Sequence, residues 1–139
     1  MRGAVMNAAD LSPQALALLL DEANHAPQES VQSALAGLDG VQHHRVSGLI
    51  SHLTQTKRAS WAAVAAATGT VPPPDDAGLR RLMAWEVEQA RQLSPEQLCA
   101  ELTYSGQVMT VAELIRLNAR HSVWHAGQLA ALAGRTGSA

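Results

Sequence analysis

Hydrophobic residues recur at helical spacing through four stretches of the chain, separated by turn and loop residues. In the first stretch, Ser12 and Pro13 are typical of a helix N-cap followed by proline at the first helical position. Pro27 predicts a kink or a break into two shorter helices, and Asp39-Gly40 marks a turn. The apolar positions of this stretch are Leu16, Leu19, Leu20, Ala23, Val31, Leu35 and Leu38.

The second stretch, residues 46–69, predicts a helix with Ser47 as its N-cap and Gly69 just past its end. The segment "TVPPPDD" must be a loop, because consecutive prolines cannot sit inside a helix. On this helix the expected inward stripe carries Leu49, His52, Thr56 and Ser60.

A third helix is expected over residues 77–93, capped by Asp75 or Asp76. Ser94-Pro95-Glu96 then predicts a short helix that ends at Leu102. The inward stripe of the third helix is expected to contain Leu79, Leu82, Met83, Glu86, Ala90 and Leu93.

The last stretch follows a polar connection, "TYSGQVMT", for which we expect a partly extended form. Thr110 and Glu113 have the spacing of a capping box, and the helix behind them is expected to run to about Ala133, with Gly134 as its stop. Four substantial helices without a convincing strand pattern predict an all-α fold, a four-helix bundle in a single domain over 1–139. The segment before the last helix adds one short extra helix.

Composition supports this interpretation and excludes some partners. Hydrophobic residues make up 47% of the chain and charged residues 16%, so a packed core is expected. The net charge of −2 comes without a basic stripe, which argues against a nucleic-acid partner. Cys99 is the single cysteine, expected as a small buried hydrophobe in a reducing compartment. The start "MRGAVMNAAD" resembles no signal peptide and no apolar run is long enough for a membrane span, so we expect a soluble, cytoplasmic protein.

The last helix carries the most informative chemistry. His121 and His125 are four residues apart, which places both side chains on one helix face. The spacing by itself is weak evidence for a metal site, because a surface or hydrogen-bonded histidine pair is common. However, the expected inward stripe becomes polar for about three turns, and a buried polar cluster needs a partner such as a metal ion. Its polar and aromatic members are Asn118, His121, Trp124, His125 and Gln128.

A catalytic zinc site usually has three protein ligands, so a third is needed. His52 is the best candidate, because its helix stripe is expected to face the core. His43 and His44 fall in an expected loop where solvent satisfies them, and the direction of His25, near Pro27, stays open. Ser122 follows His121 where a zinc protease would carry Glu, which argues against that class.

The segments "SGLISHL" and "TVAELIRLNARHSVWHAGQLAAL" resemble the DinB-like (DinB/YfiT) superfamily of metal-binding proteins. The resemblance implies a four-helix bundle of the up-down-down-up type, with His52, His121 and His125 holding a divalent metal, zinc or nickel. Gly127 and Gln128 match the end of the family's final segment. Ala126 departs from it, because many members carry Arg there, so this chain lacks that charged group beside the site. A homodimer is also implied.

By the same resemblance, we expect a metal-dependent transferase that activates a low-molecular-weight thiol, such as bacillithiol or mycothiol, for attack on an electrophile. The alternatives are a non-enzymatic stress-associated or ligand-binding bundle with a structural or vestigial metal, and a metal-free bundle that acts as a dimer. Glu86 is expected either to orient a ligand imidazole or to reach solvent as a boundary residue. Asn118 and Gln128 are expected near the site, either as hydrogen-bond partners of the ligands or as helix-interface groups. Three tryptophans can line a pocket or serve packing: Trp61, Trp85 and Trp124.

Overall fold

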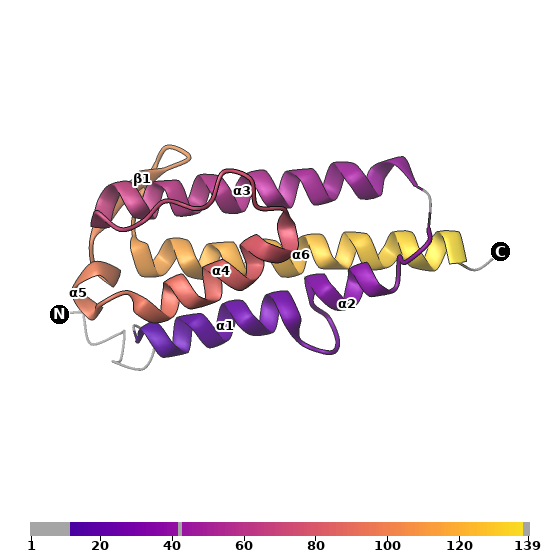
Figure 1. Ribbon diagram of the computed structural model, residues 1–139, viewed down its shortest axis with the longest axis horizontal. Coiled ribbons are helices and arrows are strands. Elements are labelled where there is room, and N and C mark those ends of the chain that lie inside the picture. The colour runs from indigo at the N-terminus through magenta and orange to yellow at the C-terminus, as the bar shows by residue number, and fades with distance from the viewer. Residues whose placement is uncertain (1–11, 42, 138–139) are drawn as a thin grey trace.

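The computed structural model describes residues 12–41 and 43–137, and this part of the chain is predominantly helical. The molecule is elongated, and its long helices run along the long axis (Figure 1). Helices α1 and α2 follow one another along one side of α6, and α3 lies along another side (Figure 1). The elements are α1 (Pro13–His25), α2 (Val31–Ala36), α3 (His44–Thr68), α4 (Leu79–Gln92), α5 (Pro95–Leu98), β1 (Glu101–Tyr104), β2 (Gln107–Thr110) and α6 (Val111–Gly137).

The first predicted helix is divided in two. The Ser12 side chain accepts a hydrogen bond from the Ala15 amide at 2.9 Å, and Pro13 occupies the first helical position, as predicted. Of the two outcomes expected at Pro27, the break is the one observed: α1 ends at His25 and Ser30 caps α2. This break lets α2 continue along α6 beyond the end of α1.

Helix α3 begins earlier than predicted and is rotated relative to the expected stripe. His43, not Ser47, is the N-cap, and its ring accepts a hydrogen bond from the Arg45 amide at 3.1 Å. His44 therefore lies in the helix and not in a loop. Gly69 ends α3 with a φ of 73°, as predicted. The buried positions of this helix are Leu53, Lys57, Ser60, Trp61 and Val64.

The predicted inward stripe of α4 is buried throughout, whereas the elements at its two ends differ from expectation. Gly78 is the N-cap without any side-chain hydrogen bond, so Asp75 and Asp76 do not cap the helix. Helix α5 is a single turn that ends at Leu98, and Leu102 belongs to β1. Cys99 is exposed, because it lies where this turn ends, which corrects the expectation of a buried thiol.

The polar connection, expected to be partly extended, is part of an antiparallel β-hairpin, and the all-α prediction did not include this strand pair. Tyr104 pairs with Gln107 across the two-residue turn Ser105-Gly106, whose φ values are 54° and 80°. Positive φ at both turn residues matches a type I′ turn, the form that suits the twist of a hairpin. The hairpin contacts α3 and α6.

Helix α6 starts with the predicted capping box. The Thr110 amide donates to the Glu113 carboxylate at 2.8 Å, and the Glu113 amide donates to the Thr110 hydroxyl at 3.1 Å. The helix continues through Gly134 to Gly137, so that glycine is not its stop.

The buried hydrophobic side chains of the described residues form two clusters. One joins α1 to the halves of α3, α4 and α6 nearer the hairpin, and includes Leu20, Trp61 and Leu114. The other joins α2 to the opposite halves, and includes Val31, Leu53 and Leu129. Along α3, α4 and α6, polar residues separate the two clusters in sequence, and these residues bear directly on the candidate site.

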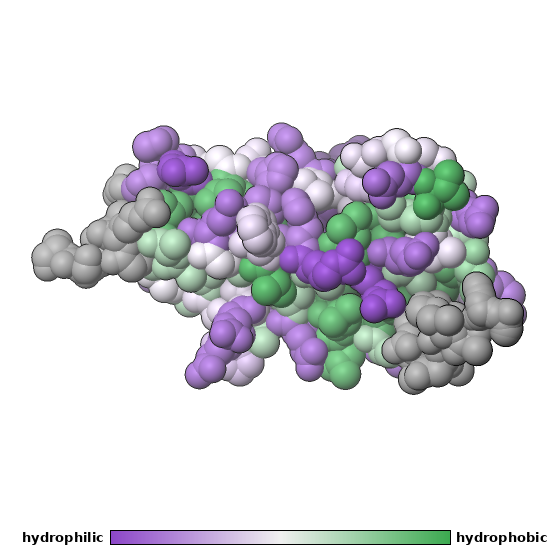
Figure 2. Space-filling model, turned by 180° about the vertical axis from the view of Figure 1, so that it is seen from behind, coloured by the Kyte–Doolittle hydropathy of each residue, from purple (hydrophilic) through white to green (hydrophobic). Residues whose placement is uncertain are grey.

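On the face seen in Figure 2, hydrophobic residues form separate patches between hydrophilic ones. None of the described helices combines the length and the hydropathy needed to cross a bilayer.

Candidate metal centre

His52 of α3 and His121 and His125 of α6 form one cluster, as the sequence predicts. Their ring centroids are 5.3 Å apart for His52 and His121, 4.7 Å for His52 and His125, and 4.3 Å for His121 and His125. Each imidazole offers one nitrogen to a common centre, and these nitrogens all lie within 4.8 Å of one another. Two helices that are far apart in sequence thus bring together three groups that could hold a metal ion.

The hydrogen bonds of His125 leave Nε2 as the nitrogen that faces the cluster. Nδ1 of His125 lies in hydrogen-bond contact with Oε1 of Gln128, one turn further along α6. An amide oxygen only accepts, so this contact puts the proton of neutral His125 on Nδ1 and leaves a lone pair on Nε2. Nε2 of His125 lies 3.0 Å from Nε2 of His121, so this lone pair faces the other imidazoles. The tautomer that a metal requires is therefore the one that Gln128 selects.

The three histidines differ in how deeply they are buried, and the cluster reaches the protein surface at His52. His125 is buried, with 8% of its surface exposed, His121 is half-buried and His52 is exposed. This corrects the expectation that His52 faces the core. The inward face of α3 instead carries Leu53, Lys57 and Trp61, and of the four positions expected there only Ser60 is buried. Solvent consequently reaches the cluster from the side of His52.

The pKa of His121 lies below its ordinary value of 6.5. Burial is the main cause, and the imidazoles of His125 and His52 and the ammonium group of Lys57 act in the same direction. A metal ligand must be neutral, and these surroundings favour the neutral form of His121.

The donor set fits a divalent ion of intermediate softness. Imidazole nitrogen is a common ligand of zinc and nickel, and two nitrogens on a tetrahedral zinc are about 3.3 Å apart, given zinc–nitrogen bonds of about 2.0–2.1 Å. The separation of 3.0 Å between His121 and His125 is close to that value, and the exposed His52 has room to adjust. Among the described residues, no fourth His, Cys, Asp or Glu joins the three. Three neutral protein ligands with a free position are typical of catalytic rather than structural zinc sites.

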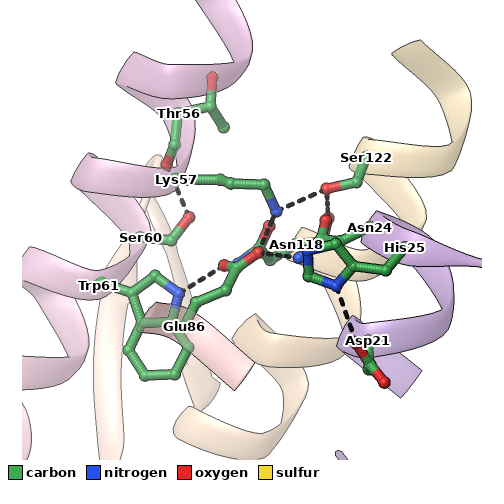
Figure 3. A network of polar contacts seen from close by, with 10 residues as sticks. All are labelled: Asp21, Asn24, His25, Thr56, Lys57, Ser60, Trp61, Glu86, Asn118 and Ser122. Atoms are coloured by element: carbon green, nitrogen blue, oxygen red, sulfur yellow. Dashed lines mark hydrogen bonds and ion pairs between the residues drawn. The ribbon is translucent and has the colours of Figure 1, made fainter. Parts of the chain in front are cut away.

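Lys57 and Glu86 form a buried ion pair (Figure 3). It lies next to the cluster, because Lys57 bonds Ser122, which follows His121 in α6, and acts on the pKa of His121. Lys57 is 1% exposed and Glu86 is 0% exposed. The ammonium group makes all three of its possible hydrogen bonds: to Glu86, to Oδ1 of Asn118 at 2.9 Å and to the Ser122 hydroxyl at 2.8 Å. A buried pair avoids a large desolvation penalty only when its remaining hydrogen-bonding groups are satisfied, and Lys57 meets that condition.

Glu86 is the other centre of this network. Its Oε1 accepts from the Trp61 indole and from the Asn118 amide, both at 2.8 Å, and its Oε2 accepts from Asn24 at 2.6 Å and from Lys57. The network therefore connects α1, α3, α4 and α6 at one level, between the two hydrophobic clusters (Figure 3). We name it the Lys57–Glu86 network; its members are Asn24, Lys57, Trp61, Glu86, Asn118 and Ser122.

The four residues predicted around the site occupy different places. Glu86 is neither a solvent-reaching boundary residue nor hydrogen-bonded to an imidazole, because its carboxylate is fully occupied by the network. Asn118 belongs to the same network. Gln128 contacts His125 directly. Trp124 is 69% exposed and lies outside the inward stripe that the sequence predicts for it, because it precedes the buried His125 by one residue on α6.

The other histidines lie apart from the cluster. His25 bonds Asp21 on its own helix, with 2.8 Å between Nδ1 and the carboxylate oxygen. His43 caps α3, and its ring stacks on that of His44 with centroids 4.9 Å apart. Trp61 and Trp85 pack edge to face with centroids 5.5 Å apart, which assigns both to packing.

Sequence reasoning missed Lys57, although a signal was present. Lys57 lies four residues from both Leu53 and Trp61, at the spacing of a helical face. A lysine on such a face is normally assigned to the boundary, since lysine is almost never fully buried without a partner. Glu86 on the inward stripe of α4 was the available indication that a partner existed.

Comparison with protein-family models, with curated proteins and with solved structures finds no match to this chain. The resemblance to the DinB-like superfamily therefore rests on the two segments that contain the three histidines.

Proposed function

We propose that this chain is a divalent-metal-binding protein of the DinB-like type, a four-helix bundle whose metal ligands are His52, His121 and His125. The observation that carries the proposal is the convergence of three imidazole nitrogens, within 4.8 Å of one another, from two helices. The contact between Gln128 and His125 adds support, because a hydrogen-bonded outer partner that fixes the tautomer is usual for metal-bound histidine.

We further propose that the protein is a metal-dependent transferase for a low-molecular-weight thiol. When bound, a divalent ion lowers the pKa of a coordinated thiol and holds its sulfur as the nucleophilic thiolate. Transfer would form a bond between that sulfur and an electrophilic carbon while the bond from this carbon to its leaving group breaks; the leaving group would depart with the electron pair, and the thiol proton would pass to solvent. The exposed position of His52 supports this, since solvent and a thiol can both approach from that side.

The charge of the surroundings favours an anionic co-ligand. Three neutral imidazoles leave the full +2 charge of a metal uncompensated, and the nearest buried carboxylate, Glu86, is already paired with Lys57. A thiolate would supply negative charge that the protein does not. This argument supports a thiol over a neutral ligand at the free position.

Metal quantification tests the first proposal. Wild-type protein, loaded with zinc or nickel and dialysed, should retain about one ion per chain. His121→Ala should retain almost none, whereas His25→Ala, outside the cluster, should match wild type. Absence of bound metal in the wild type, or full retention by His121→Ala, would overturn the site.

Turnover tests the second proposal. The metal-loaded protein should consume bacillithiol, mycothiol or another small thiol together with an electrophile, and His121→Ala should not. Bound metal without turnover for any thiol would reject the transferase and leave a non-enzymatic metal-binding bundle.

A further inference from the structure

A pocket of about 220 Å³ adjoins the histidine cluster on the side of the hairpin. Helix α3 lines it with Thr56 and Ser60, the hairpin with Tyr104 and Ser105, and α6 with residues that include Leu117 and His121. His121 therefore belongs both to the candidate metal centre and to the pocket wall. Thr56 lies one helical turn from His52, so the pocket follows directly from the cluster along α3.

The pocket is small and almost free of ionisable groups. Sites for drug-sized ligands usually measure about 300–1,000 Å³, so this one accepts only a fragment-sized molecule. Apart from His121, none of its lining residues carries a group that ionises near neutral pH. An ionic group without a partner would be costly there, which favours an uncharged occupant.

The walls offer an apolar base and hydroxyl groups. Leu114 and Leu117 provide the apolar surface. The hydroxyls of Thr56, Tyr104 and Ser105 have no hydrogen-bond partner among the described residues and are available to a ligand. Asn118, which also lines the pocket, is held in place by Lys57 and Glu86. This arrangement suits a ring or short apolar body with one or two polar substituents.

Two larger cavities, of about 490 and 540 Å³, lie on another side of α6, along α1 and α2. Both are lined by Val123, and neither is lined by a residue of the histidine cluster. They give no reason to expect a ligand that reaches the metal centre.

We propose that the pocket next to His121 binds a small, uncharged, partly apolar molecule, which presents a polar atom to the metal centre. The role of this occupant rests on the proposed function: in a thiol transferase, the molecule in the pocket would be the electrophile and not the thiol. Thiols of the size of bacillithiol or mycothiol exceed a fragment-sized pocket, whereas the exposed side at His52 leaves them room.

The pocket itself can be tested without any metal. Benzyl alcohol, titrated into metal-free protein in the millimolar range, should cause saturable shifts of the backbone amides of Thr56, Tyr104 and Leu117 in NMR spectra. Thr56→Phe, which fills the pocket, should abolish them. The matched variant Gln55→Phe, one residue away on the exposed side of α3, should keep them. Leu117→Ala provides a second variant and should weaken binding. Shifts that do not saturate in wild type, or that persist in both Thr56→Phe and Leu117→Ala, would overturn the pocket.

Its relation to the metal centre needs a second measurement. Zinc-loaded protein should bind benzohydroxamic acid at least about tenfold more tightly than acetohydroxamic acid, because only the former has a ring to bury. Thr56→Phe should remove this difference and leave the affinity for acetohydroxamic acid unchanged. Equal affinities in wild type would overturn the proposal that the occupant faces the metal. If zinc does not bind, the proposed function fails, and the benzyl alcohol titration still decides whether the pocket exists.

Discussion

Lys57 donates a hydrogen bond to the hydroxyl of Ser122 at 2.8 Å, so a buried ammonium group is fixed one residue from His121. Ser122 in turn donates to the backbone carbonyl of Asn118 at 2.9 Å, within α6. The Lys57–Glu86 network thus holds the same turns of α6 that present the histidines. We infer that it sets the position of α6 relative to α3, and hence of His121 and His125 relative to His52.

Substitutions at Lys57 and Glu86 should have strongly non-additive effects on the free energy of unfolding. The two carboxylate oxygens of Glu86 accept four hydrogen bonds. Glu86→Gln replaces one of these oxygens with an NH₂ group, which cannot accept from the donors that face it, and it leaves Lys57 charged and buried without its counter-ion. We expect a loss of about 3–5 kcal/mol in the free energy of unfolding. The double variant Lys57→Met/Glu86→Gln should lose clearly less than the sum of the single variants, as measured by urea unfolding.

Arg91 and Glu88 provide the matched control, because they form an exposed pair three residues apart on α4. Glu88→Gln should change the free energy of unfolding by less than about 0.5 kcal/mol. Additive effects of Lys57→Met and Glu86→Gln, or a loss as small as that of Glu88→Gln, would show that the network does not stabilise the fold.

The buried face of a helix could be predicted from the sequence where only one set of positions forms an apolar stripe. In and beside α4, all six positions of the predicted stripe are buried, because only one face of this helix carries apolar residues at helical spacing: Leu79, Leu82, Met83, Glu86, Ala90 and Leu93. On α3, two stripes compete. The expected stripe runs through Leu49 and His52, whereas the buried one runs through Leu53 and Trp61, and it includes Lys57 in its ion pair with Glu86. That pairing depends on Glu86, from a different helix, which periodicity within α3 cannot reveal.

The candidate site is predictable for a different reason. His121 and His125 share a helix face by spacing alone, and that relation is local. The third ligand depends on family resemblance as well as on the stripe, and His52 reaches the cluster although its expected burial is wrong. The hairpin escapes prediction as a strand pair because its strands are four residues each, although Ser105-Gly106 is a known turn signal. Consequently the pocket between the hairpin and His121 could not be predicted.

Gln128 should matter for metal affinity and little for folding. Its side chain is exposed but contacts Nδ1 of His125, where it fixes the tautomer that leaves Nε2 free. Gln128→Leu should weaken zinc binding about 10–100-fold, as measured by competition with a chromophoric chelator. Gln92→Leu, at an exposed glutamine of α4, a helix that contributes no residue to the cluster, should leave the affinity unchanged. Equal affinities for Gln128→Leu and wild type would mean that the contact has no role in ligation.

The stability of the metal-free protein should fall in acid through His121. Its pKa is lowered in the folded state, mainly by burial, while in the unfolded chain it returns to about 6.5. The unfolded chain therefore binds more protons, and the free energy of unfolding decreases as pH falls through 6.5 toward the lower pKa of the folded state. His121→Gln should show a shallower decrease than wild type between about pH 7.5 and 5.5 in urea unfolding. A steeper or identical slope would contradict the assigned direction.

The hairpin turn should depend on glycine at position 106. Gly106 has a φ of 80°, and a Cβ there would meet no atom within 4 Å, so any cost of Gly106→Ala is conformational and not steric crowding. We expect a loss of about 1–2 kcal/mol in hairpin stability, visible as faster amide exchange of β1 and β2. Gly48 of α3 likewise has open space where a Cβ would lie, but its φ is not positive. Gly48→Ala should therefore raise the free energy of unfolding, by about 0.5–1 kcal/mol. If both substitutions change stability in the same direction, the backbone conformation of the glycine does not determine the effect of adding a Cβ. The hairpin that forms one wall of the pocket would then not depend on glycine in this turn.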